Sequence, residues 1–407
     1  MRSEVNGRLF DASRTTADMT AVKDSVHDYI SLDPVAADLV DTPEFQRLRH
    51  IKQLSTVRLV YPSASHTRFE HSLGVYHLAS RALSHLGIEG EEAAHVRAAA
   101  LLHDIGHGPY GHQTEDLIRR RTGRDHDEIH DLLDGSVVGE TLETHGLDPM
   151  HVADIVDGGG GLGQLVSGEL DVDRMDYLVR DAHHTGVPYG TIDHGRLVRQ
   201  LRYRDGQLVL AEGNVQTAES LLLARALMNG TVYRHHTSRI AGAMLERASE
   251  RLVDDGLPIE EFVRMADHDL LVALGERVPD LGKRIERRTL YKRAIWAPLS
   301  AVPADVVELG HDETRAAERE IAEISDVAPE KVIIDAPPTP RIKESRSRVV
   351  VDGVVQRLES ASELVGALRA TERAQWRLGV YAPEVARDEV AAAAVDVLDL
   401  PMHVVSQ

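Results

Sequence analysis

The sequence predicts a mainly α-helical protein, in which a large helical core precedes a smaller lobe of mixed α and β structure. Apolar residues recur at three- and four-residue spacing from about Ser31 to Leu252, which is the period of amphipathic helices. Beyond about Leu257, short runs rich in Val and Ile alternate with helical stretches. A chain of 407 residues exceeds one ordinary core, so two units are expected. The predicted parts are an N-terminal segment (1–20), the core (21–257) and the lobe (258–407).

Composition restricts the kinds of site that the chain can form. The sequence has no cysteine, which excludes disulfides, thiol nucleophiles and thiolate metal sites. Any divalent metal must therefore be held by His, Asp or Glu, a donor set that suits Mn, Mg, Fe or Zn. No apolar run reaches the length of a membrane span and the N-terminus has no apolar signal region, so we expect no membrane contact and a cytoplasmic location.

The charge balance is strongly acidic. The formal net charge is -20, and only 6 Lys accompany 40 Arg. A dense acidic surface with few lysines is typical of halophilic proteins, although a GC-rich genome explains the shortage of Lys equally well. Such a surface repels nucleic acid, so a phosphate-bearing substrate would have to be gathered by a local basic pocket.

Capping residues mark the helices of the core. Asp41-Thr42-Pro43-Glu44 reads as a helix opening, with Asp or Thr as the cap and Pro in the first turn. Thr67 is expected to cap a helix that carries Phe69 to Leu83 on its apolar face. A further helix should run from Glu91 to Leu102 and lead into His103 and Asp104, with a break by Gly106 to Pro109.

The second half of the core contains turn signals and one long apolar pattern. We expect Gly158 to Gly161 to form a flexible loop, because the run lacks the strand and helix of a dinucleotide fingerprint. Tyr203 to Leu208 predicts a hairpin that turns at Asp205-Gly206. A single long helix is predicted from about Val215 to Leu252.

Strand and helix signals alternate in the predicted lobe. Pro337, Pro338 and Pro340 are expected in a connection, because proline cannot donate a hydrogen bond inside a central strand. The predicted elements are strands at Lys331–Asp335, Arg348–Val351, Val354–Leu358 and Leu378–Tyr381, and helices from about Ser362 and from Pro383 to about Leu398.

Three segments carry His and Asp residues in an order that suits a metal site. The first ends at His71 in HTRFEH, the second is HDIGHGPYGH at 103–112, and the third is LDVDRMDYLVRDAHH at 170–184. A lone His-Asp pair is ordinary surface chemistry, and the whole ordered set is what points to function. Two His and two Asp from three helices can surround a divalent cation and leave positions open for water and phosphate.

These segments resemble the catalytic core of deoxynucleoside triphosphate triphosphohydrolases of the SAM-and-HD-domain type. The similar text is DTPEFQRLRHIKQLSTVRLVYPSASHTRFEHSLGVYHLA, LLHDIGHGPYGH and DVDRMDYLVRDAHHTG. The resemblance covers roughly residues 21–250 and extends more weakly into the lobe. It implies an HD-domain fold and hydrolysis of a dNTP to deoxynucleoside and triphosphate. We expect no SAM module, because only about 20 residues precede the match.

The resemblance also implies which residues carry the chemistry. His107 and His112 would face the phosphates, and one of them would protonate the leaving 5′ oxygen. His126 and Asp127 stand where the family has a His-Glu pair, although the neighbouring Glu128 makes the register ambiguous and His130-Asp131 is a second candidate pair. The implied metal ligands are His71, His103, Asp104 and Asp173.

For the substrate, the resemblance points to phosphate clamps and sugar contacts. Arg68 and Arg174 are the clamps, and the family has Lys at the second position. Gln53 and Asp181 would bind the 3′-hydroxyl, while Leu54 and Tyr177 would close the space of a 2′-hydroxyl. The stretch Tyr233–Arg239 departs from the family, and one or two of Arg234, His235, His236 and Arg239 are expected to reach phosphate or base.

A second, regulatory nucleotide site is also implied. The family reads guanine with an Asp, a Gln and an Arg, which here are Asp41, Gln46 and Arg49. The preceding loop has Lys23 where the family carries a polar amide. A guanine nucleotide activator and a homo-oligomer, either dimer or tetramer, therefore belong to the predicted partners alongside dNTPs.

Two other functions stay open at this point. The chain could be another HD phosphohydrolase, acting on cyclic dinucleotides or alarmones, although His107 stands where the cyclic-dinucleotide enzymes usually have Lys. It could instead be a catalytically weak nucleotide sensor, since Asp127 and the stretch 233–239 depart from the family.

Overall fold

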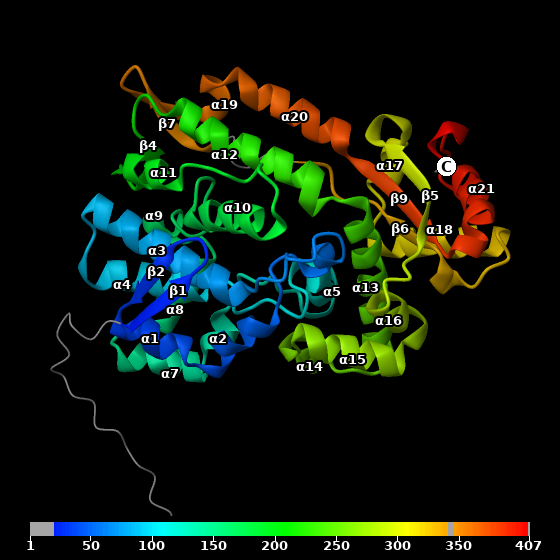
Figure 1. Ribbon diagram of the computed structural model, residues 1–407, viewed down its shortest axis with the longest axis horizontal. Helices are drawn as coiled ribbons and strands as arrows, with labels where there is room; N and C mark the ends of the chain where they lie inside the picture. Colours follow the sequence, from blue (N-terminus) through cyan, green and yellow to red (C-terminus); the bar gives the residue numbers. More distant parts are fainter. Residues whose placement is uncertain (1–19, 341–345, 406–407) are drawn as a thin grey trace, which may run out of the picture.

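The computed structural model describes residues 20–340 and 346–405, and it confirms a mainly helical fold with a mixed α/β region toward the C-terminus (Figure 1). Residues 1–19 of the predicted N-terminal segment lie outside the described residues. The described chain opens with an antiparallel hairpin, β1 (Thr20–Asp24) and β2 (Asp28–Leu32). The sequence prediction of a loop around Lys23 was wrong, because Lys23 lies in β1 opposite Tyr29.

Three helices form the centre of the core. α3 (Arg68–Leu86) packs against α4 (Gly90–Leu102) on one side and α10 (Val172–Thr185) on the other. The predicted cap is present, since the Glu70 carboxylate accepts hydrogen bonds from the Thr67 backbone and hydroxyl. The predicted start at Pro43 is also confirmed, in the short α2 (Pro43–Arg47) after α1 (Pro34–Val40).

Shorter helices complete the core between α4 and α10. They are α5 (His112–Thr122), α6 (His130–Leu133), α7 (Val137–Thr144), α8 (Pro149–Val156) and α9 (Gly160–Gly163). The glycine run is therefore not wholly a flexible loop, because α9 is a packed helical turn. A Cβ on Gly161 would lie 1.8 Å from the Tyr203 hydroxyl oxygen, so glycine is what allows the neighbouring hairpin to approach.

The hairpin prediction is confirmed, and the long-helix prediction is wrong. After α11 (His194–Gln200), β3 (Leu201–Arg204) and β4 (Gln207–Leu210) join through Asp205 and Gly206, which both have positive φ. The expected single helix is split into α12 (Val215–Met228), a π-helical turn η3 (Asn229–Tyr233) and α13 (His236–Asp254). Contacts from elsewhere hold the break: Asn229 donates to Glu372 (2.9 Å) and Tyr233 donates to Asp181 (2.7 Å).

One sheet joins strands from both sides of the predicted boundary near residue 257. Its order is β3-β4-β7-β8, with β4 parallel to β7 (Arg348–Val351) and β7 antiparallel to β8 (Val354–Arg357). After the short α19 (Leu358–Ala361), α20 (Glu363–Gln375) lies along α12 (Figure 1). The division of the chain into core and lobe stays a prediction.

The rest of the C-terminal region belongs to two apolar clusters. α14 (Ile259–Arg264), α15 (Asp267–Arg277) and α16 (Pro279–Glu286) form one apolar cluster with α13 and α5. A three-stranded sheet of β5 (Lys292–Pro298), β9 (Arg377–Ala382) and β6 (Ile333–Asp335) packs with α17 (Ala304–Val307), α18 (His311–Ile324) and α21 (Arg387–Val397).

The predicted strands and helices of this region are confirmed with shifted ends. Lys331 belongs to a 3-10 turn and not to β6, and Leu358 begins α19. A 3-10 turn precedes α21. The three prolines after β6 lie in a connection, as predicted.

Candidate active site

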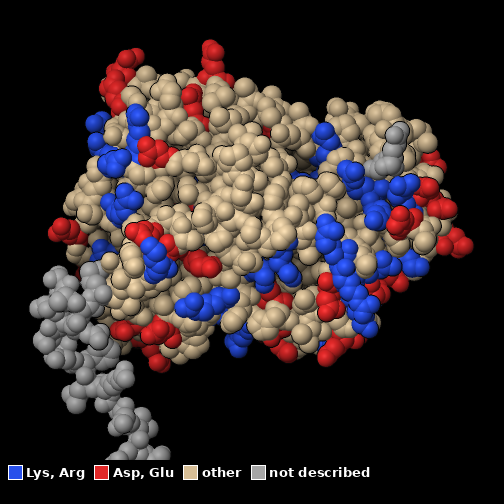
Figure 2. Space-filling view, viewed as in Figure 1, with Lys and Arg blue, Asp and Glu red and all other residues tan. Residues whose placement is uncertain are grey.

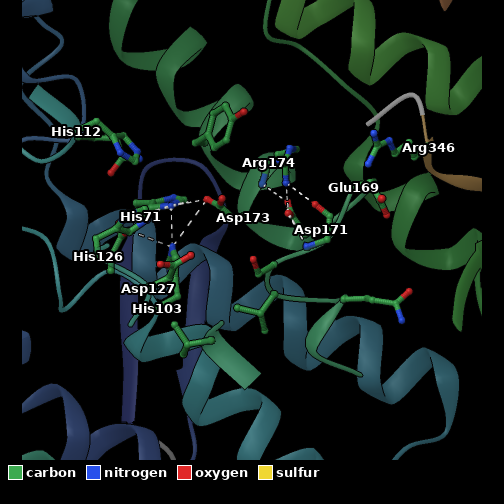
Figure 3. Close-up of a pocket in the computed structure, with 18 of the residues that line it drawn as sticks. His71, His103, His112, His126, Asp127, Glu169, Asp171, Asp173, Arg174 and Arg346 are labelled. Atoms are coloured by element: carbon green, nitrogen blue, oxygen red, sulfur yellow. Dashed lines mark hydrogen bonds and ion pairs between the residues drawn. The ribbon is translucent and has the colours of Figure 1, made fainter. Parts of the chain in front are cut away.

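A large cavity lies between the metal-ligand candidates of the core and the β7–β8 hairpin with α20. Its volume is about 1150 Å³. His71, His103, Asp104 and Asp173 line one part of it, and five arginines of the C-terminal region line another. Figure 3 shows His71, His103 and Asp173 close together, with Arg174 and Asp171 between them and the more distant Arg346.

The structure brings the four predicted metal ligands together. His71 comes from α3, His103 and Asp104 directly follow α4, and Asp173 lies in the first turn of α10. The Asp173 Oδ1 lies 2.9 Å from His71 Nε2 and 3.8 Å from His103 Nε2. The two Nε2 atoms are 3.3 Å apart, and Asp104 Oδ1 lies 3.5 Å from His103 Nε2. Three helix ends thus converge on one point.

The imidazoles are oriented for a cation. His71 donates from Nδ1 to Asp176 Oδ2 (2.8 Å), and His103 donates from Nδ1 to the Ala100 carbonyl (3.0 Å). Both rings therefore present Nε2 to the cluster, in the arrangement that metal-bound histidines adopt. His71, His103 and Asp104 place their ligand atoms within 4.8 Å of one another, and Asp173 adds a second carboxylate next to the two histidines. Two imidazole nitrogens and two carboxylates fit a divalent cation, whose identity the donor set leaves open.

The pKa of His71 reflects the carboxylates that surround the candidate metal site. Burial lowers the pKa of His71, but the hydrogen bonds to Asp173 and Asp176 outweigh burial and raise the pKa to about 10. A cation at this position replaces that proton, so metal binding should tighten as the pH rises.

A buried ion network stands behind His71. Asp176 also accepts from Arg180 Nε (2.8 Å) and from His27 Nε2 (2.6 Å). Arg180 Nη1 in turn donates to Asp24 Oδ2 (2.8 Å) at the end of β1. The N-terminal hairpin is thereby tied to a metal-ligand candidate. Asp176 and Arg180 both fall in the segment 170–184, but the sequence analysis gave neither a role, although their opposite charges at i,i+4 on one helix were a signal.

A second cluster of histidines adjoins the first. The His107 and His126 rings stack with centroids 3.9 Å apart, and the His112 ring lies 4.6 Å from that of His107. Glu115 of α5 accepts a hydrogen bond from His112 Nδ1 (2.7 Å) and another from His126 Nδ1. The three histidines implied by the resemblance therefore lie together, and Glu115, which the sequence analysis missed, joins two of them.

Burial and neighbouring charges shift the pKa values of these side chains in different directions. Burial and then the Arg68 guanidinium hold the pKa of His107 well below its usual range. Burial also lowers the pKa of His126, but the hydrogen bond to Glu115 outweighs burial and raises it. Burial raises the pKa of Glu115, and the two histidine hydrogen bonds outweigh that effect and lower it. The cluster thus contains one histidine held neutral and one that holds its proton.

The carboxylate predicted to pair with His126 is different from the one observed. Asp127 lines the cavity, but the hydrogen-bond partner of His126 is Glu115. The alternative pair lies outside the cavity wall, where His130 pairs with Asp154 (2.8 Å) and Asp131 with Arg124 (2.8 Å). Glu115 precedes His126 by 11 residues, so no adjacent-pair motif could have found it.

Both predicted phosphate clamps line the cavity, and both already have carboxylate partners. Arg68 is buried, with Nη1 2.8 Å from Asp104 Oδ2. A Cβ on Gly111, which has a φ of +52°, would lie 2.5 Å from Arg68 Nη2, so glycine makes room for the guanidinium. Arg174 donates to the Gly168 carbonyl (2.7 Å) and to Asp171. Burial raises the pKa of Asp171 to about 7, despite the nearby Arg174.

The predicted sugar contacts are only partly on the cavity wall. Gln53 and Tyr177 line it, and Gln53 Oε1 is a buried atom with no hydrogen-bond partner among the described residues. Leu54 packs against the main apolar core. Asp181 is buried and accepts from His66 Nε2 (2.8 Å) and from the Tyr233 hydroxyl (2.7 Å). Gln53 and Tyr177 therefore face the cavity, whereas Asp181 is buried and does not line it.

The stretch 233–239 does not reach the cavity. Arg239 donates to Asp335 Oδ2 (2.9 Å) of β6, and His235 and His236 stack on each other. Neither they nor Arg234 line the cavity, and the expectation that one or two of these side chains contact phosphate or base stays a prediction. The π-helical turn before them points the stretch toward β6.

The predicted regulatory residues lie outside the cavity, and two of them contact each other. Gln46 donates to the Val40 carbonyl (2.7 Å) and accepts from Arg49 Nε (2.8 Å). The Arg49 guanidinium also lies 3.5 Å from the centre of the Phe69 ring. Asp41 is exposed at the end of α1. Their role in binding a guanine nucleotide stays a prediction.

The part of the chain that contains both side-chain clusters matches a known protein family. The pattern of the HD domain matches residues 68–181, and that of the HD associated region matches residues 192–407. An uncharacterized protein of Methanocaldococcus jannaschii is 34% identical, over 90% of this chain and 80% of its own length. The deoxynucleoside triphosphate triphosphohydrolase SAMHD1 homolog of Dictyostelium discoideum is 30% identical, over 67% of this chain and 59% of its own length.

A solved structure shows the same architecture over nearly the whole chain. A phosphohydrolase from Bacteroides thetaiotaomicron is 27% identical, with a TM-score of 0.73, and the match covers 90% of this chain and 100% of that one. Among the residues that the structure describes, no helix combines the length and the apolar character that crossing a membrane requires.

Proposed function

The chain belongs to the family of HD-domain proteins with an HD-associated region, and from this premise we propose that it hydrolyses deoxynucleoside triphosphates to deoxynucleoside and triphosphate. The observation that carries the proposal is the pairing of two clusters in one cavity: His71, His103, Asp104 and Asp173 beside the histidines that Glu115 joins. The name of the Dictyostelium relative supports the substrate.

The two clusters divide the chemistry between them. His71, His103, Asp104 and Asp173 would hold a divalent cation, which would supply Lewis-acid activation of water and of the α-phosphate. Glu115 keeps a proton on His126, which makes that imidazole fit to protonate the leaving 5′ oxygen. The exposed His112 lines the cavity and would face the phosphates, whereas His107, held neutral next to Asp104, is buried behind the cavity wall and would act on them only through its neighbours. Arg68 and Arg174 offer guanidinium groups to phosphate oxygens.

The partners of the reaction form part of the same proposal. Gln53 and Tyr177 would contact the sugar, and the orphan Gln53 Oε1 offers an acceptor for a 3′-hydroxyl. A guanine nucleotide bound near Asp41, Gln46 and Arg49 would activate a dimer or tetramer by stabilising the assembled state. The acidic surface makes multimolar KCl the natural assay medium if the chain comes from a halophile.

Identifying which bond is broken tests the proposed function. Hydrolysis of dGTP in ¹⁸O water should place the label on triphosphate, because water attacks the α-phosphorus. Mass spectrometry of the products, with Mn or Mg, at low and multimolar KCl and with or without added GTP, measures this. Label on a monophosphate or on free phosphate would contradict the proposal. Turnover of cyclic dinucleotides or alarmones in place of dNTPs would move the chain to another HD phosphohydrolase class.

Replacing Glu115 with Gln should change the pH dependence of the reaction. Without the carboxylate, burial lowers the pKa of His126, so the proton is lost at lower pH. Since a group with a raised pKa acts as an acid below that pKa, the alkaline limb of the pH–rate profile should move to lower pH. At neutral pH the rate should fall by roughly 10–100-fold.

An exposed Glu140→Gln variant is the matched control, because Glu140 is exposed on α7 away from the cavity. A Glu115→Gln profile that is uniformly lower at every pH, with an unmoved limb, would show that Glu115 only holds the fold.

A further inference from the structure

The far wall of the cavity is made of arginines that the proposed chemistry does not use. Five of them line it together with the metal-ligand candidates: Arg346, Arg348, Arg357, Arg369 and Arg373. We call this set the arginine wall. It belongs to β7, β8, α20 and the residue two before β7, all from the C-terminal region. The sequence analysis missed it because no motif links these positions.

The arginines of the wall are forced close together. Arg348 and Arg357 are direct partners in the register of the β7–β8 hairpin. Arg369 and Arg373 are four residues apart on α20 and so share one face of that helix. Like charges at both kinds of position are destabilising. Repulsion between these arginines therefore destabilises the folded chain locally, and a bound anion would reduce that repulsion.

Few carboxylates balance these charges. Glu359 pairs with Arg357 (3.5 Å) and with Arg369. Arg346, Arg348 and Arg373 form no ion pair with a carboxylate of the described residues, whereas Arg357 and Arg369 do. Glu169, which Figure 3 shows near Arg346, and Glu372 also line the cavity, so the five arginines outnumber the carboxylates around them in a chain with 66 acidic and 46 basic residues. Figure 2 shows that on the face in view acidic and basic side chains lie in small neighbouring groups instead.

Position and size set the wall apart from the metal centre. In Figure 3, Arg346 lies on the far side of Arg174 and Asp171 from His71 and His103. The cavity of about 1150 Å³ also exceeds the range of roughly 300–1,000 Å³ that is typical of small-molecule sites. There is room for a ligand at the wall in addition to one at the metal centre. Guanidinium forks match the oxygens of phosphate groups, and several forks suit a chain of phosphates.

We propose that the arginine wall is a second anion subsite, which binds an oligophosphate chain in the same cavity as the metal centre but apart from it. The oligophosphate has two sources: triphosphate released by the reaction, or the phosphates of a second nucleotide. Binding at the wall does not depend on the proposed function; only the choice between the sources rests on it.

The test compares the full chain with the double variant Arg348→Gln/Arg357→Gln. The control is Arg319→Gln/Arg387→Gln, which removes the same charge from α18 and α21, outside the cavity. Isothermal titration with inorganic triphosphate should show one site fewer, or binding weaker by roughly a hundredfold, in the first variant alone. In thermal unfolding without triphosphate, that variant should be no less stable than wild type, because repulsion is relieved. The rise in Tm that triphosphate causes should shrink in it.

Two further arms distinguish the sources. If the wall holds released triphosphate, product inhibition of dNTP hydrolysis should weaken in the wall variant and not in the control. If it holds a second nucleotide, the number of GTP molecules bound per chain should fall in the wall variant.

Two outcomes would overturn the proposal. The first is triphosphate binding that is equal in wild type, wall variant and control. The second is a single-stranded oligonucleotide that displaces triphosphate from the wall at far lower concentration, which would make the wall a nucleic-acid surface. If no dNTP is hydrolysed but triphosphate still binds in a wall-dependent way, the proposed function fails and the subsite remains.

Discussion

Replacing His103 and Asp104 together with alanine is expected to remove the divalent metal and abolish hydrolysis. The change deletes two of the four donors that converge between α3, α4 and α10. Loss of even an outer partner of a metal ligand costs roughly 10–100-fold in affinity or activity, so the loss of two ligands should exceed about a hundredfold. Elemental analysis of the purified protein, together with the dNTP assay, measures both effects.

The double variant should also be less stable, because Asp104 neutralises the buried Arg68 (2.8 Å). Leaving that guanidinium unpaired destabilises the core by roughly 3–5 kcal/mol. Asp173→Asn is the cleaner companion, since the Asp173 side chain is 31% exposed and its hydrogen-bond partner is a histidine. It should lose metal and activity while its far-UV circular dichroism stays that of wild type. Full metal occupancy in Asp173→Asn would contradict the assignment of the ligands.

The sequence contained enough to locate the candidate metal site, because the proposed ligands lie where local structure is easy to predict. Thr67 caps the helix that carries His71, and α4 ends immediately before His103. Asp173 falls in the first turn of α10, after the capping residue Asp171. Caps and helix ends follow from local residue types, so three helix ends in the right order were a firm basis for the site.

What the sequence could not supply depended on contacts between distant segments. The pairing of Asp24 with Arg180 spans 156 residues, and no local pattern encodes it. The 229–233 turn likewise depends on contacts with the distant helix α20. Asn229 donates a hydrogen bond to Glu372, and Gly230 packs against the Gln375 side chain. The arginine wall depends on a parallel pairing of β4 with β7, whose strands lie far apart in the chain. Helical periodicity carries no information about such pairings.

Replacing Arg180 with Met should produce the largest loss of stability of any single change behind the metal centre. Arg180 is fully buried and bridges Asp176 and Asp24. Removing one member of a buried ion network costs roughly 3–5 kcal/mol, because the remaining charges are left unpaired. Asp176 would also hold His71 less firmly, which should weaken metal binding by roughly 10–100-fold. Urea unfolding and metal titration measure the two effects.

The pH dependence separates this electrostatic cause from a simple packing defect. In wild type, burial raises the pKa values of Asp24 and Asp176, but Arg180 outweighs burial and lowers both, so they favour folding above their unfolded pKa and lose that contribution as the pH falls. Without Arg180, the guanidinium no longer lowers these pKa values while burial still raises them, so both should lie above their wild-type positions even though His27 and His71 still donate hydrogen bonds to Asp176. Protonation of the folded variant should therefore begin at a higher pH than in wild type. The stability gap between variant and wild type should therefore narrow from neutral pH to about pH 5.

Arg97→Met provides the matched control for that experiment. Arg97 pairs with Asp33 (3.0 Å) near the surface, with its side chain 29% exposed. A pair so close to solvent contributes under about 1 kcal/mol, and its loss should depend little on pH. If Arg180→Met costs no more than Arg97→Met, or if its cost stays constant as the pH falls, then the network that links the N-terminal hairpin to His71 does not stabilise the fold through charge.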